Sequence, residues 1–550
     1  MVLDNDVALR RKVSQLFVVR ASGHIYDIQR NYPKWELTNQ ELNYLLEEGI
    51  GGVILFGGSA WELKSRCKMF RELALSPLLL CADIEEGLGQ RFHGGTLLVP
   101  PIALSQIYIK DAQRALELAE EYGRCIGYQA RSCGLNWVLA PVCDVNTNPD
   151  NPVINVRSWG EDASTVSRLI SAFQSGLSLE GVLSCAKHFP GHGDSHIDSH
   201  IDLPILTHDL SRLEDLEFLP FQAAIASGVN SVMTGHLLLP ELDDKHPATL
   251  SKAVITNLLR EKLAFEGLIV TDALVMNAIT RTYGPGQAAR MAFEAGADLI
   301  LMPESIELAI QSLFESFKSG RIPMESLDKS LNRRYVLLEK IKDKYSTIPF
   351  QNTASGKKEL ERPVNFSLSE ELVNRSLEIH NPKEIQKTPL GINLLRIDGF
   401  LPNKFISNSS PAICIPENAG YQTCLLYPKG ISPWTDNPKS PLALDRFPQG
   451  LFFLQLFIRG NPFQGKLQGK EPWLSVVKQL QKKNLLSGIV VYGSPYLWND
   501  LREVLNKSIP AAYSPGNMAQ VQKKILSCLF HPSILENIIP SSSDLNDFTD

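Results

Sequence analysis

The chain has 550 residues, a formal net charge of −6 and a pI near 6.1. Its length exceeds what one ordinary hydrophobic core contains, so we expect two domains. The near balance of 54 basic and 60 acidic residues gives no reason to expect a nucleic acid or a membrane surface as a partner. The amino terminus, MVLDNDVALRRKVSQLF, lacks the apolar run of a signal peptide, and no apolar run is long enough to span a membrane, so we expect a cytoplasmic protein.

Short apolar runs alternate with helical stretches from the start of the chain to residue 345. Helices are expected, for example, over residues 111–125 and 165–179. The candidate strands are SQLFVV from Ser14, GGVILF from Gly51, PLLLCAD from Pro77, NWVLAPVCD from Asn136, VLSCAK from Val182, VNSVMTGH from Val229, GLIVTD from Gly267 and DLILMP from Asp298. This alternation predicts a (β/α)8 barrel of the TIM type over residues 1–345, although a doubly wound open sheet would give a similar pattern.

The composition changes after residue 345. Residues 346–367 are rich in Ser, Thr, Asn, Lys and Pro, which indicates a linker. In residues 368–535, the apolar runs AICIP, TCLLYP, GLFFLQLF, GIVVYG and IPAAYS alternate with helical stretches at 473–483 and 496–506. They predict a second, smaller α/β domain with a parallel sheet. Residues 536–550 read as a flexible acidic tail.

Polar side chains collect where the strands of the predicted barrel end. Enzymes with this fold carry out their chemistry at that rim. Each residue also has a simpler interpretation, as a helix cap, a surface charge or a satisfied core histidine, and only their joint placement at successive strand ends favours a site. These residues are Asp83 with Arg91 in the next loop, Asp144 with Arg157, Lys187 with His188, His236, and Asp272.

The densest polar segment is KHFPGHGDSHIDSHIDLP, residues 187–204, with four histidines and three aspartates. The histidines recur at every fourth residue, which on a helix would place them on one face as in some zinc sites. Pro190, Gly191 and Gly193 argue against a helix. In an extended loop, Asp198 and His200 would point the same way, and such a pair suits general acid and base catalysis. A polar surface loop and a metal site remain the alternatives on local grounds.

Several segments, taken in order, resemble family 3 glycoside hydrolases, in the branch of bacterial β-N-acetylglucosaminidases. They are GGVILF, ADIEEGLGQRF, NPDNPVINVRSWGED, KHFPGHG followed after four residues by DSH, and FEGLIVTDALVM. The resemblance implies a barrel followed by a flavodoxin-like α/β domain. It also implies a carbohydrate substrate and a reaction that needs no cofactor and no metal. The oligomeric state is left open.

The resemblance also implies roles for individual residues. Asp272 would be the nucleophile that forms a covalent glycosyl-enzyme, and His200, oriented by Asp198, would be the general acid and base. The positions that hold the sugar hydroxyls and the N-acetyl group would be Asp83, Arg91, Arg157, Lys187 and His188. The sequence departs from the family's usual pattern at Glu86, Gly87 and Leu88, so contacts to the substrate are expected to differ there.

The function implied is that of a retaining exo-β-N-acetylglucosaminidase, and the expected cytoplasmic location favours muropeptides as substrates. Two alternatives share the family, a phosphorylase and a β-glucosidase. Two others belong to different classes, a metal-dependent barrel hydrolase and a sugar-binding protein without activity.

Overall fold

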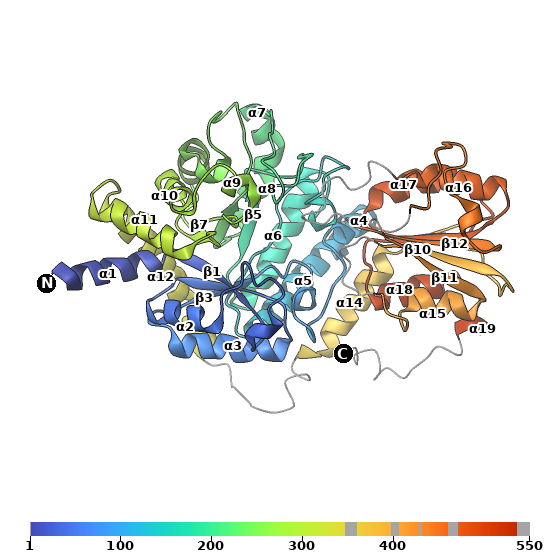
Figure 1. Cartoon of the computed structure of the whole chain (residues 1–550), viewed down its shortest axis with the longest axis horizontal. Helices are drawn as coiled ribbons and strands as arrows, with labels where there is room; N and C mark the ends of the chain where they lie inside the picture. Colours follow the sequence, from blue (N-terminus) through green and yellow to red (C-terminus); the bar gives the residue numbers. More distant parts are fainter. Residues whose placement is uncertain (1, 347–359, 398–405, 428–431, 460–470, 536–550) are drawn as a thin grey trace. The chain divides into compact units, whose positions relative to one another are not determined.

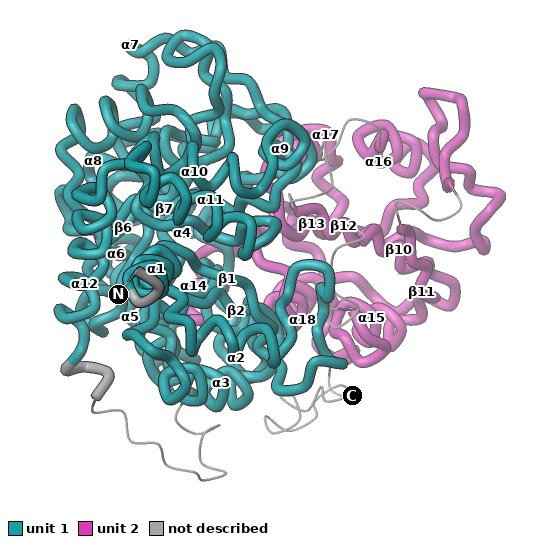
Figure 2. Tube along the Cα trace, turned by 60° about the vertical axis from the view of Figure 1, so that its left-hand side comes forward, with its two compact units in different colours: residues 1–368 teal, residues 369–550 magenta. Residues whose placement is uncertain are grey.

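The computed structural model describes residues 2–346, 360–397, 406–427, 432–459 and 471–535. The chain divides into two compact units, Met1–Leu368 and Ser369–Asp550, which Figure 2 colours teal and magenta. Most of the predicted linker, residues 347–359, and the predicted acidic tail, residues 536–550, lie outside the described residues.

The first unit is a closed ring of parallel strands. Each strand overlaps one of the predicted apolar runs: β1 (Phe17–Ser22), β2 (Gly52–Phe56), β3 (Leu79–Ala82), β4 (Trp137–Val138), β5 (Cys185–Phe189), β6 (Ser231–Thr234), β7 (Leu268–Thr271) and β8 (Ile300–Leu301). Parallel ladders join β4-β3-β2-β1-β8 and β5-β6-β7. The bridges Trp137↔Leu183 and Val270↔Leu299 close the two remaining gaps. The predicted barrel is therefore confirmed, and the open sheet is excluded.

Helices follow the strands and surround the barrel (Figure 1). They are α1 (Val2–Ser14), α2 (Asn39–Glu47), α3 (Ala60–Leu73), α4 (Ile102–Lys110), α5 (Ala112–Ser132), α6 (Ala163–Leu179), α8 (Phe218–Ala226), the π-helical η6 (Ala253–Lys262), α10 (Pro285–Ala295), α11 (Ile306–Lys318) and α12 (Met324–Ser346). Local sequence sets several of their starts. Thr38 and Ser59 form capping boxes with Glu41 and Glu62, so α2 and α3 begin where these side chains satisfy otherwise unpaired backbone N–H groups.

The barrel interior fixes which polar side chains face its mouth. Leu79 and Cys81, Leu183 and Cys185, and Leu268 and Val270 pack in one interior cluster. Side chains two residues apart in a strand point to the same face. The residues that follow these interior positions by two, at the carboxyl ends of β3, β5 and β7, are Asp83, Lys187 and Asp272. The sequence thus directs all three towards the mouth of the barrel.

Helix α12 covers the opposite end of the barrel. Its residues Leu338 and Ile341 join the interior cluster. Arg334 donates to the carbonyl oxygens of Gly51 and Pro77, which lie just before β2 and β3. Burial of these apolar side chains therefore closes the amino ends of the strands and leaves the carboxyl ends for the site.

The second unit contains a six-stranded sheet in the order β11-β10-β12-β13-β14-β9. The strands are β9 (Glu378–His380), β10 (Gly391–Ile397), β11 (Tyr421–Leu426), β12 (Leu451–Ile458), β13 (Leu486–Gly493) and β14 (Ala511–Ser514). Helices α14 (Pro363–Ser376), α15 (Pro411–Asn418), α16 (Trp473–Lys482), α17 (Pro495–Val504), α18 (Ala519–Ser527) and α19 (Pro532–Leu535) complete the described elements of this part of the chain.

Four predictions for this region were wrong or incomplete. The run AICIP is not a strand but lies in α15, because Ser410 and Pro411 form a helix start and a short apolar run fits either structure. Strands β9 and β10 were missed. Strand β9 pairs antiparallel with β14, so the sheet is mixed and not purely parallel. Residues 363–367, expected in the linker, are helical.

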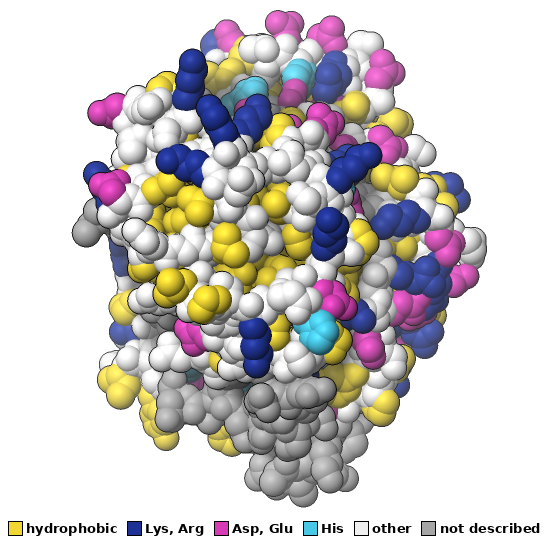
Figure 3. Space-filling model, turned by 90° about the vertical axis from the view of Figure 1, so that its right-hand side faces the viewer, with side chains coloured by type: hydrophobic (Ala, Val, Ile, Leu, Met, Phe, Trp, Pro, Cys, Tyr) yellow, Lys and Arg dark blue, Asp and Glu magenta, His cyan; other side chains and the backbone are white. Residues whose placement is uncertain are grey.

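Hydrophobic side chains also reach the surface. On the face of the molecule shown in Figure 3 they gather near the centre, with basic and acidic side chains around them. More than half of an ordinary protein surface is apolar, so this face by itself indicates no partner. In the described part of the chain, no helix is both long and apolar enough to cross a membrane.

Asp298 lies just before β8, at the amino ends of the barrel strands, and is 1% exposed. Its carboxylate accepts from Arg260 at 2.7 Å, Arg333 at 2.8 Å and the backbone N–H of Ile269 at 2.9 Å. We expect Asp298→Ala to lower the free energy of unfolding by about 3 kcal/mol, because two arginines lose their buried partner. Urea unfolding would measure this. Asp328→Ala, which removes only an exposed ion pair with Lys12, should cost less than about 1 kcal/mol.

Candidate active site

Four charged side chains meet at the mouth of the barrel. Nζ of Lys187, at the end of β5, lies 2.7 Å from Oδ1 of Asp83 and 2.6 Å from Oε1 of Glu85, both in the loop after β3. Arg157, from the loop after β4, binds both carboxylate oxygens of Glu85, each at 2.8 Å. Lys187 and Glu85 are 2% and 4% exposed. The cluster therefore ties three strand ends together through buried ion pairs.

The attraction between the charged side chains of this cluster outweighs the hydration that they lose on burial. Burial alone would raise the pKa of Glu85, but Arg157 and Lys187 hold it well below its ordinary value. Burial alone would lower the pKa of Lys187, but Asp83 and Glu85 raise it. Glu85 likewise raises the pKa of Arg157 against the effect of burial. All three groups remain charged at neutral pH, and they form a rigid set of donors and acceptors that suits sugar hydroxyl groups.

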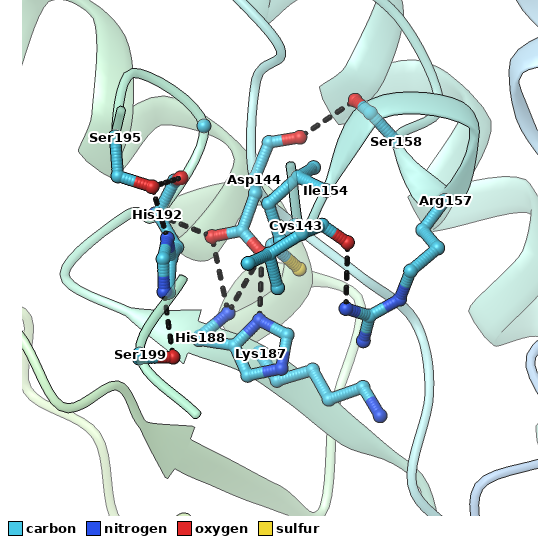
Figure 4. Close-up of polar contacts among 12 residues, drawn as sticks. Cys143, Asp144, Ile154, Arg157, Ser158, Lys187, His188, His192, Ser195 and Ser199 are labelled. Atoms are coloured by element: carbon cyan, nitrogen blue, oxygen red, sulfur yellow. Dashed lines mark hydrogen bonds and ion pairs between the residues drawn. The ribbon is translucent and has the colours of Figure 1, made fainter. Parts of the chain in front are cut away.

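Asp144 anchors the start of the loop that follows β5 (Figure 4). Its Oδ2 lies 2.7 Å from Nδ1 of His188, and its Oδ1 accepts from the backbone N–H of His192 at 2.7 Å. Burial alone would raise the pKa of Asp144, but His188, His192 and these bonds lower it. A buried, ionised carboxylate therefore fixes the ring of His188 and the backbone at His192.

His192 continues this anchoring further along the loop. Its Nδ1 lies 2.7 Å from Oγ of Ser195, and its Nε2 lies 3.0 Å from Oγ of Ser199 (Figure 4). The ring is 1% exposed, and burial lowers its pKa to about 4. His192 is thus a neutral, buried imidazole whose two nitrogens bind both ends of the segment 195–199.

Asp198 and His200 form a pair through a turn. Oδ1 of Asp198 accepts from the backbone N–H of His200 at 2.9 Å and lies 2.9 Å from its Nδ1. The expected extended geometry was wrong, because Ile201 and Asp202 donate back to the carbonyl oxygen of Asp198 and curl the chain. The side chain of Asp198 is fully buried and that of His200 is 21% exposed. A carboxylate on Nδ1 assigns proton transfer to Nε2.

Asp272 follows β7 directly and is partly buried. Burial alone would raise the pKa of Asp272, but His236, His188 and His200 lower it to about 2, helped by the backbone N–H of Ala273. His236 is fully buried between Thr249 and the carbonyl oxygen of Ala273, and burial lowers its pKa. Asp272 is therefore ionised at neutral pH.

Comparison with known proteins agrees with this geometry. The family model described as the glycosyl hydrolase family 3 N terminal domain matches residues 8–337. The model described as the bacterial glycosyl hydrolase family 3 C-terminal domain matches residues 384–531. The chain belongs to glycosyl hydrolase family 3. Both parts predicted from the resemblance are thereby confirmed at the level of the family.

Individual members of family 3 are similar to this chain over different lengths. Beta-hexosaminidase A of Pseudoalteromonas piscicida is 32% identical over 348 residues, which cover 58% of this chain and 58% of that protein. A beta-hexosaminidase of Neisseria meningitidis serogroup B is 35% identical over 289 residues, 52% of this chain and 79% of that protein. A solved family 3 β-N-acetylglucosaminidase from Paenibacillus is 28% identical with a TM-score of 0.74, and the match covers 94% of this chain and 96% of that one.

The family 3 barrel brings the predicted site residues to one rim. Lys187 and Arg157 both bind Glu85, and Lys187 also binds Asp83. Arg91 donates from Nε to the carbonyl oxygen of Asp83 at 3.0 Å. His188 and His200 both act on the pKa of Asp272. The catalytic roles predicted for Asp272, His200 and Asp198 and the substrate-binding roles predicted for the other five residues stay predictions.

Sequence reasoning missed the supporting residues. Glu85 was not chosen, although it lies two residues after Asp83 in the same loop. Asp144 was predicted to lie at a strand end but was given no role. His192 was included only as one of the four histidines of residues 187–204. Nothing in the spacing of His192 distinguishes it from His196, whose Nδ1 lies 3.0 Å from Asn148. Only the folded loop shows which histidine is buried.

The helical zinc pattern does not occur. His192, His196 and His200 lie in a loop of turns and bends and not on one helical face. Within the ranges that the structure describes, no group of three or more His, Cys, Asp or Glu side chains is placed to hold a metal ion.

The low pKa of His192 gives a testable dependence of stability on pH. The unfolded chain takes up a proton near pH 6.5, whereas the folded chain does so only near pH 4. The unfolded state therefore binds more protons between these values, and stability falls as pH falls through this window. In His192→Gln, the loss of unfolding free energy from pH 7 to pH 5 should be smaller by about 2 kcal/mol. Urea unfolding at both pH values measures it, and an equal loss in both proteins would contradict the assignment.

Proposed function

We propose that this chain is a retaining exo-β-N-acetylglucosaminidase that removes terminal β-linked N-acetylglucosamine. One observation carries the proposal: an ionised Asp272 and a histidine oriented by a buried carboxylate lie at the mouth of the same barrel. A retaining glycosidase needs a nucleophile and a group that first donates and then accepts a proton. The names of the similar family 3 proteins support the acetamido sugar.

The first half of the reaction uses both groups at once. The carboxylate of Asp272 attacks the anomeric carbon while the bond from that carbon to the leaving oxygen breaks. Protonated His200 donates its Nε2 proton to the leaving oxygen, so the aglycone departs as a neutral alcohol. The product of this step is a covalent glycosyl-enzyme with neutral His200.

In the second half of the reaction, His200 acts as a base and Asp272 is the group that water displaces. His200 takes a proton from water through Nε2, and the water oxygen bonds to the anomeric carbon as the bond to Asp272 breaks. The sugar leaves with its original configuration because each step inverts it once. Asp198 keeps the ring in the tautomer that both steps require.

The cluster around Lys187 serves the bound sugar. Lys187, Arg157 and Arg91 donate hydrogen bonds, and Asp83 accepts them from hydroxyl groups. Asp144 fixes the ring of His188 for the same purpose. Because these groups already hold one another, little ordering remains to be done when the sugar binds.

The finer part of the proposal concerns the natural substrate and location. We place the enzyme in the cytoplasm and assign it the cleavage of muropeptides during recycling of the cell wall. Purified enzyme should then hydrolyse N-acetylglucosaminyl-anhydromuramyl compounds. If it cleaves other β-glycosides and leaves these intact, the substrate assignment fails while the chemistry stands.

The chemistry is tested with a chromogenic β-N-acetylglucosaminide beside the matching β-glucoside. We expect wild type to prefer the acetamido sugar and Asp272→Asn to lose about 10³-fold or more in kcat, since the nucleophile is removed. His200→Ala should lose about 10² to 10⁴-fold, more for leaving groups of high pKa, because these need the proton.

Asp328→Asn is the matched control, because the carboxylate of Asp328 is exposed and, among the described residues, forms an ion pair with Lys12 alone. It should retain wild-type activity. If neither Asp272→Asn nor His200→Ala lowered the activity, the mechanism would be refuted. A product that carries phosphate when phosphate is added would identify a phosphorylase instead.

A further inference from the structure

The first half of the loop after β5 is held by buried side chains of the loop after β4. Asn151 donates to the carbonyl oxygens of His192 at 2.8 Å and Gly193 at 2.9 Å. Asn148 donates to the carbonyl oxygen of Ser195 at 3.0 Å. The two asparagines are 0% and 6% exposed. Opening this half would leave buried amides without partners, so it is fixed against the barrel.

The half of the loop that carries His200 is more open to solvent. Residues 200–203 are each partly or fully exposed. The backbone N–H groups of Ile201 and Asp202 donate to the carbonyl oxygen of Asp198 at 2.9 and 3.0 Å, and this turn sets the ring of His200 against Asp198. These bonds lie within the turn, so they do not set its position relative to β7.

Contacts beyond the turn reach the next two strand ends. The backbones of Pro204 and Leu206 pair with Leu238, in the loop after β6, through two hydrogen bonds of 2.9 Å. The side chain of Asp202 extends further, and its Oδ1 lies 3.2 Å from Nη1 of Arg281, in the segment after β7. Among the described residues, neither of these two side chains has another ion-pair partner.

Arg281 projects from a well-anchored part of the chain. It directly follows α9 (Asn277–Thr280), and its backbone N–H donates to the carbonyl oxygen of Asn277. Ile279 in α9 is 0% exposed. Leu274 and Val275, between Asp272 and α9, donate to carbonyl oxygens at the end of β8, each at 3.0 Å. The ion pair therefore joins the turn that carries His200 to the same segment that begins with Asp272.

The ion pair suits a positioning role better than a stabilising one. The side chains of Asp202 and Arg281 are 60% and 54% exposed. An exposed ion pair shifts a population by at most about fivefold, so it adds little to the stability of the whole chain. Proton transfer is more demanding, because a displacement of about 1 Å can cost about 10²-fold in rate. A weak contact next to His200 can therefore matter for the reaction and not for the fold.

We propose that Arg281 is a positioning residue that holds the pair Asp198–His200 in place relative to Asp272 through its ion pair with Asp202. The inference rests on the proposed glycosidase activity, in which His200 protonates the leaving oxygen. Arg281 acts through the loop and does not contact the substrate.

The test compares two aryl β-N-acetylglucosaminides, one that releases phenol and one that releases 2,4-dinitrophenol. Phenol has the higher pKa and needs the proton from His200, whereas dinitrophenol leaves without it. We expect Arg281→Gln to lower kcat/KM about fivefold for the phenyl substrate and less than about twofold for the dinitrophenyl one. The midpoint of urea unfolding should not change. High salt should lower the phenyl-to-dinitrophenyl ratio of wild type in the same direction, without any substitution.

A double-mutant cycle separates action through Asp202 from a direct contact with the substrate. Asp202→Asn should reproduce the selective loss of Arg281→Gln, and the double variant should lose no more than either single variant, because all three remove one contact. Arg281→Lys keeps the charge and should stay near wild type. Exchanging the charges, with Asp202→Arg and Arg281→Asp together, should restore most of the loss.

Arg321→Gln is the matched control. Arg321 is 58% exposed and pairs with Glu294 at 2.9 Å, but it lies between α11 and α12. Its ratio should equal that of wild type. The proposal is overturned if Arg281→Gln leaves the ratio unchanged, if it slows both substrates equally, or if the losses multiply in the double variant. In each of these cases a selective loss in His200→Ala would still uphold the glycosidase. If wild type cleaves neither substrate, the glycosidase and the role of Arg281 fall together.

Discussion

The site depends on the need to pair buried charges at the mouth of the barrel. Lys187 and Glu85 are almost fully enclosed, and an isolated charge in such a place would cost several kcal/mol of desolvation. Glu85 meets this need by binding Lys187 and Arg157 together. The ends of β3, β4 and β5 are held in register as a result, although the ladder between β4 and β5 is reduced to single bridges. The same ion pairs that stabilise the rim fix hydrogen-bond donors and acceptors at the mouth of the barrel.

A second buried carboxylate positions the loop that follows β5. Asp144 fixes His188 and the backbone of His192, and His192 in turn binds Ser195 and Ser199. Ser199 lies between Asp198 and His200 in the sequence, so this chain of contacts ends beside the pair that these two residues form. Protonation of His192 would break the contacts, because its ring accepts and donates as a neutral group. Stability at low pH and the position of Asp198 and His200 are thus properties of one network.

The carboxyl ends of different strands supply different parts of one rim. Charged groups come from β3, β4 and β5, and Asp272 follows β7. Parallel strands make this possible because every loop after a strand opens at the same rim.

The sequence by itself determined the eight strands and the polar residues at their ends, because apolar runs and the side chains that follow them are local features. It left an open sheet as an alternative, and only the bridges Trp137↔Leu183 and Val270↔Leu299 of the folded chain exclude it. In the second domain it misassigned AICIP, missed β9 and β10 and predicted a purely parallel sheet, since short apolar runs do not distinguish a helix from a strand and pairing direction depends on distant partners. Only the tertiary structure decided the roles of Glu85 and His192 and the turn that joins Asp198 to His200. Burial and hydrogen-bond partners come from residues far apart in the chain, and spacing alone does not encode them.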